Sequence, residues 1–100
     1  MIQISNKYKI TPAKGDVYIG RGSPLGNPYV IGKHGNRVEV ILKYAEWIKQ
    51  QILEDNREVC EALNEILERH RSGDSVRLVC FCAPQKCHGE VIRDLIHMKG

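Results

Sequence analysis

Residues 76–82 read Val-Arg-Leu-Val-Cys-Phe-Cys, a nearly continuous apolar run in the last third of a 100-residue chain. Such a run is typical of a β-strand that is covered on both faces, as in a parallel sheet packed between helices. We therefore predict that this segment is the core strand of an α/β protein.

Two further strands are predicted near the N-terminus. Ile2 and Ile4 alternate with polar residues, and residues 17–19 (Val-Tyr-Ile) form a second β-rich run after a turn region. Residues 20–28 follow directly and contain three glycines and two prolines. This density of helix and strand breakers predicts an ordered loop.

Three amphipathic helices are predicted from apolar residues at three- and four-residue spacings. The first spans about residues 38–53 with Asn36 as its N-cap, and the second spans about residues 56–71 with Asp55 in the same role. In each case a glutamate lies three residues after the cap, as in a capping box. The last helix begins near Cys87 and reaches the C-terminus, with its apolar side formed by Val91, Ile92, Leu95 and Ile96.

The order strand, strand, helix, helix, strand, helix predicts a small α/β sandwich with a short, mostly parallel sheet and about three helices. Residues 1–100 should form a single domain, because two halves of this length could not each bury a core. Ligands of such folds collect at the carboxyl ends of strands. If the strands are parallel neighbours, the loops that follow residues 19 and 82 open on one rim.

The composition limits the class of partner. The net charge of +3 comes from basic residues spread along the chain, which gives no strong signal for nucleic acid. No apolar stretch approaches the roughly 20 residues that span a bilayer, so we expect a cytoplasmic protein without a membrane partner. Tyr29 and Trp47 are candidates for an exposed aromatic surface, which would suit a homodimer.

The cysteine loop holds the candidate catalytic residues. Cys87 and His88 fall where the last helix begins, and the unpaired N–H groups and positive dipole end found there stabilise a thiolate. Cys87 is therefore the candidate nucleophile or anion-contacting thiol, with His88 as its base and Cys82 as a ligand contact. The alternative is that the cysteines are small buried packing residues.

The same loop could instead hold zinc. Cys80, Cys82, Cys87 and His88 supply four donors, which is enough for a tetrahedral ion. Neighbouring residues seldom both reach one ion, and the usual Cys-x2-Cys knuckle is absent. We therefore predict no obligatory cofactor and retain zinc as an alternative.

The loop at residues 20–28 holds the candidate ligand-binding residues. Arg21 presents a charged fork suited to phosphate or carboxylate, with Gly22 beside it for a sharp turn. Ser23, Gly26 and Asn27 complete the predicted binding loop, which two prolines stiffen. A purely structural turn would need similar residues, and that alternative stays open.

Two separated motifs, read together, resemble a known family. Residues 17–28 and residues 80–89, with Tyr44 and Trp47 between them, are similar to the domain-of-unknown-function family numbered 4326, which comprises small bacterial and phage proteins. The resemblance runs from about Ser5 to about Ile96. It implies where the site lies, and it implies no particular reaction.

These observations predict a pocket between residues 20–28 and residues 82–88 that binds a nucleotide or related phosphorylated small molecule. If the protein is an enzyme, the expected chemistry is thiol-dependent hydrolysis or group transfer. One alternative is a non-catalytic protein that sequesters or senses the ligand. The other is a zinc-supported interaction module.

Overall fold

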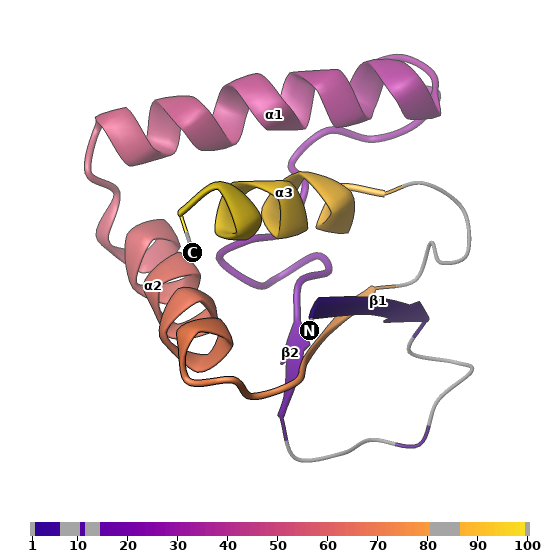
Figure 1. Ribbon diagram of the computed structural model, residues 1–100. Helices are drawn as coiled ribbons and strands as arrows, with labels where there is room; N and C mark the ends of the chain where they lie inside the picture. The colour runs from indigo at the N-terminus through magenta and orange to yellow at the C-terminus, as the bar shows by residue number, and fades with distance from the viewer. Residues whose placement is uncertain (1, 7–10, 12–14, 81–86, 100) are drawn as a thin grey trace.

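The structure, a computed structural model, describes residues 2–6, 11, 15–80 and 87–99. One sheet contains three strands in the order β1-β3-β2, namely β1 (Ile2–Asn6), β2 (Asp16–Tyr18) and β3 (Val76–Cys80), and both pairings are parallel. Three helices accompany it, namely α1 (Arg37–Leu53), α2 (Arg57–Arg71) and α3 (Gly89–Lys99) (Figure 1). The predicted small α/β fold is therefore confirmed.

The strand β3 lies at the centre of the sheet, as its apolar sequence indicates. Val76, Leu78 and Cys80 alternate along it and are each at most 1% exposed. On both neighbouring strands the residues of the same face, such as Ile4 and Val17, pack against the same core. Buried residues of all three helices join this cluster, so the described residues share one core.

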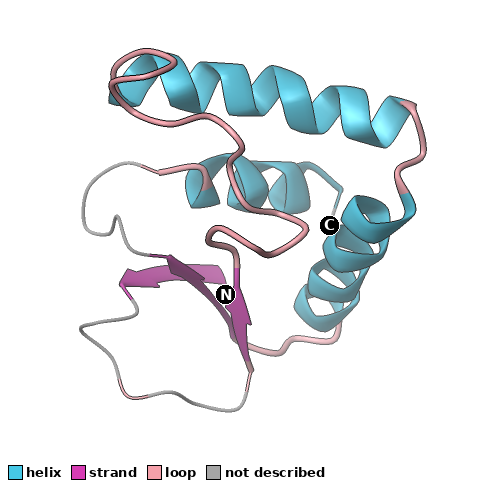
Figure 2. Ribbon diagram, turned by 180° about the vertical axis from the view of Figure 1, so that it is seen from behind, coloured by secondary structure: helices cyan, strands magenta, loops and turns pink. Residues whose placement is uncertain are grey.

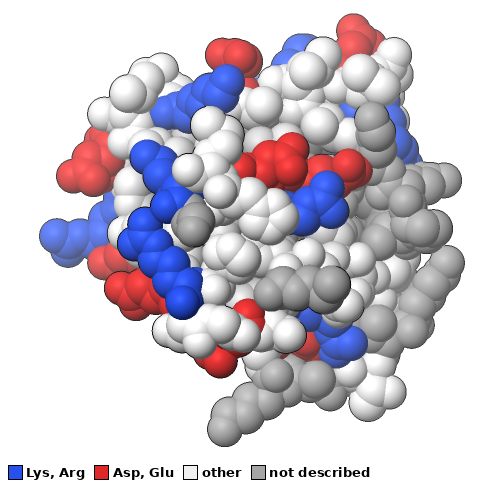
Figure 3. All heavy atoms as spheres, in the orientation of Figure 1, with Lys and Arg blue, Asp and Glu red and all other residues white. Residues whose placement is uncertain are grey.

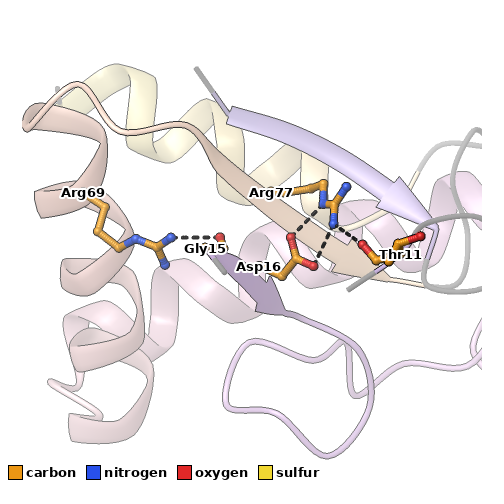
Figure 4. A network of polar contacts seen from close by, with 5 residues as sticks. All are labelled: Thr11, Gly15, Asp16, Arg69 and Arg77. Carbon is orange, nitrogen blue, oxygen red and sulfur yellow. Dashed lines mark hydrogen bonds and ion pairs between the residues drawn. The ribbon is translucent and has the colours of Figure 1, made fainter. Parts of the chain in front are cut away.

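The prediction that helices cover β3 on both faces is wrong. The helices α1, α2 and α3 lie on one side of the sheet (Figure 2). On the other face, Arg77 donates from Nε to Oδ1 of Asp16 at 2.7 Å and from Nη2 to Oδ2 at 2.8 Å, and it also donates to the Thr11 carbonyl (Figure 4). The one charged residue in the apolar run therefore marks the face opposite the helices, where Val79 is nonetheless buried at 5% exposure.

The helix ends explain where α1 stops and α2 begins. Asn36 accepts a hydrogen bond from the Glu39 N–H while Glu39 accepts from the Asn36 N–H, so the predicted capping box is confirmed. Asp55 is not the N-cap of α2, because it has a φ of 56° and belongs to the end of α1. Its N–H donates to the Ile52 carbonyl and the following N–H donates to that of Gln51, which is the Schellman pattern.

Asn56 takes the N-cap position of α2 instead, and its side chain accepts from the Val59 N–H. An asparagine and an aspartate side by side can each cap a helix, so the sequence alone could not choose between them. Within the described part of the chain, no helix combines the length and the apolar character needed to cross a membrane.

Candidate functional site

The site lies where the carboxyl ends of β2 and β3 meet. The Ile19 N–H donates to the Val79 carbonyl at 2.9 Å, which extends the pairing of β2 with β3 by one residue. The chain then enters the loop at residues 20–28, and α3 begins beside it (Figure 1). A cavity of about 180 Å³ opens here.

The cavity wall combines five parts of the chain. The lining residues are Gly20, Arg21 and Asn27 of the loop, Tyr29 and Ile31 just after it, Arg37, Val40 and Ile41 of α1, Cys80 of β3, and Cys87 and His88 before α3. The two segments that the sequence places on one rim therefore lie together, with Arg21 and Cys87 on the wall of the same cavity.

Two of the residues predicted to contact a ligand, Ser23 and Gly26, form hydrogen bonds within the loop. The Ser23 hydroxyl donates to the Gly20 carbonyl at 2.7 Å, and the Gly26 N–H donates to the Ser23 carbonyl at 3.1 Å. A Cβ on Gly26 would lie 2.5 Å from the Gly20 oxygen, and Gly22 has a φ of 90°. Gly22, Ser23 and Gly26 are not among the residues that line the cavity, so their visible role is to shape the loop that presents Arg21.

Asn27 lines the cavity and also anchors the loop to α1. Its Nδ2 donates to the Val40 carbonyl at 3.3 Å, and its Oδ1 accepts from the Tyr29 N–H at 2.9 Å. A second anchor is the buried Tyr44 hydroxyl, which donates to the Leu25 carbonyl at 2.7 Å. These bonds between the loop and α1 hold the cavity wall in place.

Cys87 is buried in the wall, at 3% exposure. The helix α3 begins at Gly89, so Cys87 precedes it, and the Cys87 sulfur accepts the Gly89 N–H at 3.3 Å. The next three N–H groups donate to the carbonyls of Cys87 and His88. These amides already have acceptors within the chain, so an anion in the cavity would have to be held by side chains. The positively charged side chains of the lining residues belong to Arg21 and Arg37. Cys82, the third predicted residue of this loop, lies outside the described residues.

His88 is a buried neutral imidazole whose orientation is fixed. Its Nε2 lies 2.5 Å from the Ile19 carbonyl oxygen, which can only accept, so Nε2 carries the proton. Its ring packs edge-on against Tyr44, with centroids 4.9 Å apart. Burial lowers the pKa of His88, and the nearby charge of Arg21 lowers it further, against the opposing effect of the Ile19 bond. The Nδ1 lone pair is then available to accept a proton or a hydrogen bond.

The His88 shift predicts a pH dependence of stability. The pKa in the folded protein is below its ordinary value of 6.5, so the unfolded chain binds more protons between the two values. Stability should therefore be full above about pH 6.5 and fall as the pH drops below it. Thermal unfolding measured across this range should show a decline that His88→Gln flattens. His97→Gln changes an exposed histidine of α3 and should keep the wild-type slope, and equal slopes in all three proteins would contradict the assignment.

Arg37 is the site residue that sequence reasoning missed. It is the first residue of α1 and lines the same cavity as Arg21 of the loop. The only available signal was its place just after the N-cap, which does not show where the helix start packs.

The aromatic surface predicted for a homodimer is not present in the expected form. Tyr29 lines the cavity. Trp47 is partly buried against the core, and its ring centroid is 5.5 Å from that of Tyr44. A homodimer stays a prediction without this support.

The zinc alternative also stays a prediction. Cys80 and Cys87 lie side by side, but His88 directs Nε2 to a backbone carbonyl, and the fourth predicted donor, Cys82, is outside the described residues. Among residues 2–6, 11, 15–80 and 87–99, no group of three or more potential metal ligands comes together.

The comparison with protein families identifies the class. The model of the domain of unknown function DUF4326 matches residues 2–98, which is nearly the whole chain. The protein belongs to the DUF4326 family, and the resemblance noted from its two motifs is confirmed. Neither the curated proteins nor the solved structures gave a match.

Proposed function

We propose that this protein binds a nucleotide or related phosphorylated small molecule, with the phosphate held by Arg21 and Arg37. The observation that carries the proposal is that two arginines, Arg21 and Arg37, line one mainly apolar cavity at the carboxyl ends of parallel strands. Guanidinium groups match phosphate oxygens in charge and in fork geometry. Ligands of open α/β folds bind at this edge of the sheet.

The remaining lining supports a ligand with an apolar part next to its anion. Ile31, Val40 and Ile41 supply aliphatic surface, and Tyr29 supplies an aromatic ring. The volume of about 180 Å³ is below the roughly 300–1,000 Å³ of a pocket that encloses a drug-sized ligand. The cavity would therefore enclose the phosphorylated end of a nucleotide, or a smaller sugar phosphate completely.

Isothermal titration calorimetry with matched pairs of ligands tests the proposal. Nucleoside monophosphates and diphosphates and ribose phosphate should bind, whereas the corresponding nucleosides and ribose should bind much more weakly. Arg21→Gln removes one charge-assisted contact and should raise the Kd of the phosphorylated ligand about tenfold. Arg57→Gln, which changes an exposed arginine at the start of α2, should bind like the wild type.

Equal affinity for phosphorylated and unphosphorylated members of a pair would overturn the proposal. So would equal losses in Arg21→Gln and Arg57→Gln, because a general effect of net charge would then explain the binding. Circular dichroism of each variant checks that the comparison is made between folded proteins.

Thiol-dependent hydrolysis or transfer is an extension of this proposal. Cys87 lines the same cavity and receives the Gly89 N–H, which favours the thiolate, and its neighbour His88 is neutral with a free ring lone pair. Turnover assays on the wild type and Cys87→Ser separate an enzyme from a non-catalytic binding protein. An enzyme loses rate and keeps affinity, whereas a sequestering or sensing protein shows binding alone. We place this activity in the cytoplasm, where cysteines stay reduced.

A further inference from the structure

Two thiols lie in contact on the cavity wall. The sulfur of Cys80, at the end of β3, is 3.4 Å from the sulfur of Cys87, which precedes α3. Neither cysteine is part of a disulfide, and they are 1% and 3% exposed. The third described cysteine, Cys60, is in α2 and does not line the cavity.

We propose that Cys80 and Cys87 form a reversible dithiol–disulfide pair that a peroxide closes. A disulfide has a sulfur–sulfur distance of about 2.05 Å, so the two sulfurs must approach by about 1.4 Å from their present contact. The proposal goes beyond ligand binding and does not depend on it, because it rests on the two sulfurs and their surroundings alone.

The surroundings assign an order to the two thiols. Cys87 accepts the Gly89 N–H at the start of α3, where the positive end of the helix dipole favours the thiolate. Cys87 is therefore the thiol that reacts first. Cys80 has no place at a helix start, and it is positioned to attack the oxidised sulfur of Cys87.

The reaction with hydrogen peroxide balances in two steps. The Cys87 thiolate attacks one peroxide oxygen, the O–O bond breaks, and the departing hydroxide takes the proton from the original thiol, which gives a sulfenic acid and water. The Cys80 thiolate then attacks the Cys87 sulfur, and the S–S bond forms as hydroxide leaves and takes the Cys80 proton as a second water. The two sulfurs lose two electrons, and the peroxide gains them.

The new bond would connect the end of β3 to the residue before α3. Cys80, Cys87 and His88 all line the cavity, so a small oxidant has a route to the pair although both thiols are buried. Oxidation would fix the wall that carries His88, and reduction by a thiol would release it. The cavity is thus inferred to carry a redox-responsive modification site.

Mass spectrometry of the full chain carrying Cys60→Ser and Cys82→Ser tests the pair. Treatment with hydrogen peroxide should remove the mass of two hydrogen atoms, block alkylation of both remaining thiols, and be reversed by dithiothreitol. Trypsin cleaves after Arg77, Lys86 and Arg93, so the two cysteines fall in different peptides that should be recovered joined. Adding Cys80→Ser should abolish the joined peptides and leave oxygen added to the Cys87 peptide, whereas adding Cys87→Ser should abolish the joined peptides and the oxygen addition at cysteine.

Oxygen addition located at Cys80 or Cys87, without joined peptides, in the chain that retains both thiols would overturn the proposal. If the doubly substituted chain fails to fold, the wild-type chain gives the same answer, because fragmentation of the joined peptides locates the bond. A bond at Cys80 supports the pair, and a bond at Cys82 contradicts it. Neither result bears on phosphate binding, so the two proposals can fail separately.

Discussion

Replacing Leu78 with alanine should lower the free energy of unfolding by about 2–5 kcal/mol. Leu78 is completely buried at the centre of β3, opposite Ile4 of β1 and Val17 of β2 in the register of the sheet. Neighbours on both sides prevent the structure from closing around the missing atoms, so a cavity would remain. Because domains of this size are stable by only about 5–15 kcal/mol, urea unfolding followed by circular dichroism should show a large shift of the midpoint.

Leu42→Ala provides the matched control for this prediction. Leu42 lies in α1 and is 62% exposed, so the same chemical change there should alter stability by no more than about 0.5 kcal/mol. If the two variants unfold at the same urea concentration, β3 is not the centre of the core and the sheet order is wrong.

The core strand could be predicted from sequence because a continuous apolar run in a small protein must be buried in its single core. The incorrect part of the prediction was that helices cover both faces of this strand. A strand alternates its side chains, so Arg77 indicates that the face it shares with the buried Val79 is polar over part of its length. With Asp16 available on the neighbouring strand, the guanidinium forms an ion pair on the side of the sheet opposite α1, α2 and α3.

The charge distribution is consistent with an ordinary polar surface outside the site. In Figure 3 basic and acidic side chains are interspersed over the visible face of the molecule. The net charge of +3 therefore does not gather into one strongly basic face in this view, and the proposed recognition of phosphate depends on the local pair Arg21 and Arg37.

The site was only partly predictable, for reasons of hydrogen bonding. Two loops rich in glycine and proline that follow neighbouring parallel strands are predicted to lie together, because parallel strands end at the same edge of the sheet. The polar residues inside a loop, however, must first satisfy the backbone of that loop. Ser23 and Asn27 are engaged in this way, whereas Arg37 reaches the cavity through the packing of α1, which no local pattern encodes.

The residue that connects this packing to the site is Tyr44, and its removal should have the second large effect. Tyr44 is fully buried, donates to the Leu25 carbonyl and packs its ring against His88 and Trp47. Tyr44→Ala should cost about 3–5 kcal/mol, as expected for the loss of a buried aromatic ring. It should also weaken binding of any ligand held by the loop, because the loop loses its buried attachment to α1.

Tyr44→Phe separates the hydroxyl from the ring. It keeps the ring contacts and leaves the buried Leu25 carbonyl without this donor, which should cost about 1–3 kcal/mol. Tyr18→Phe is the matched control, because the Tyr18 hydroxyl donates to the Arg21 carbonyl of the same loop from an exposed position and should change stability by no more than about 0.5 kcal/mol. Urea unfolding of the three variants checks the order. Equal stability of the two phenylalanine variants would show that the hydroxyl of Tyr44 does not fasten the loop to α1, and the support for a preorganised cavity would then rest on Asn27 alone.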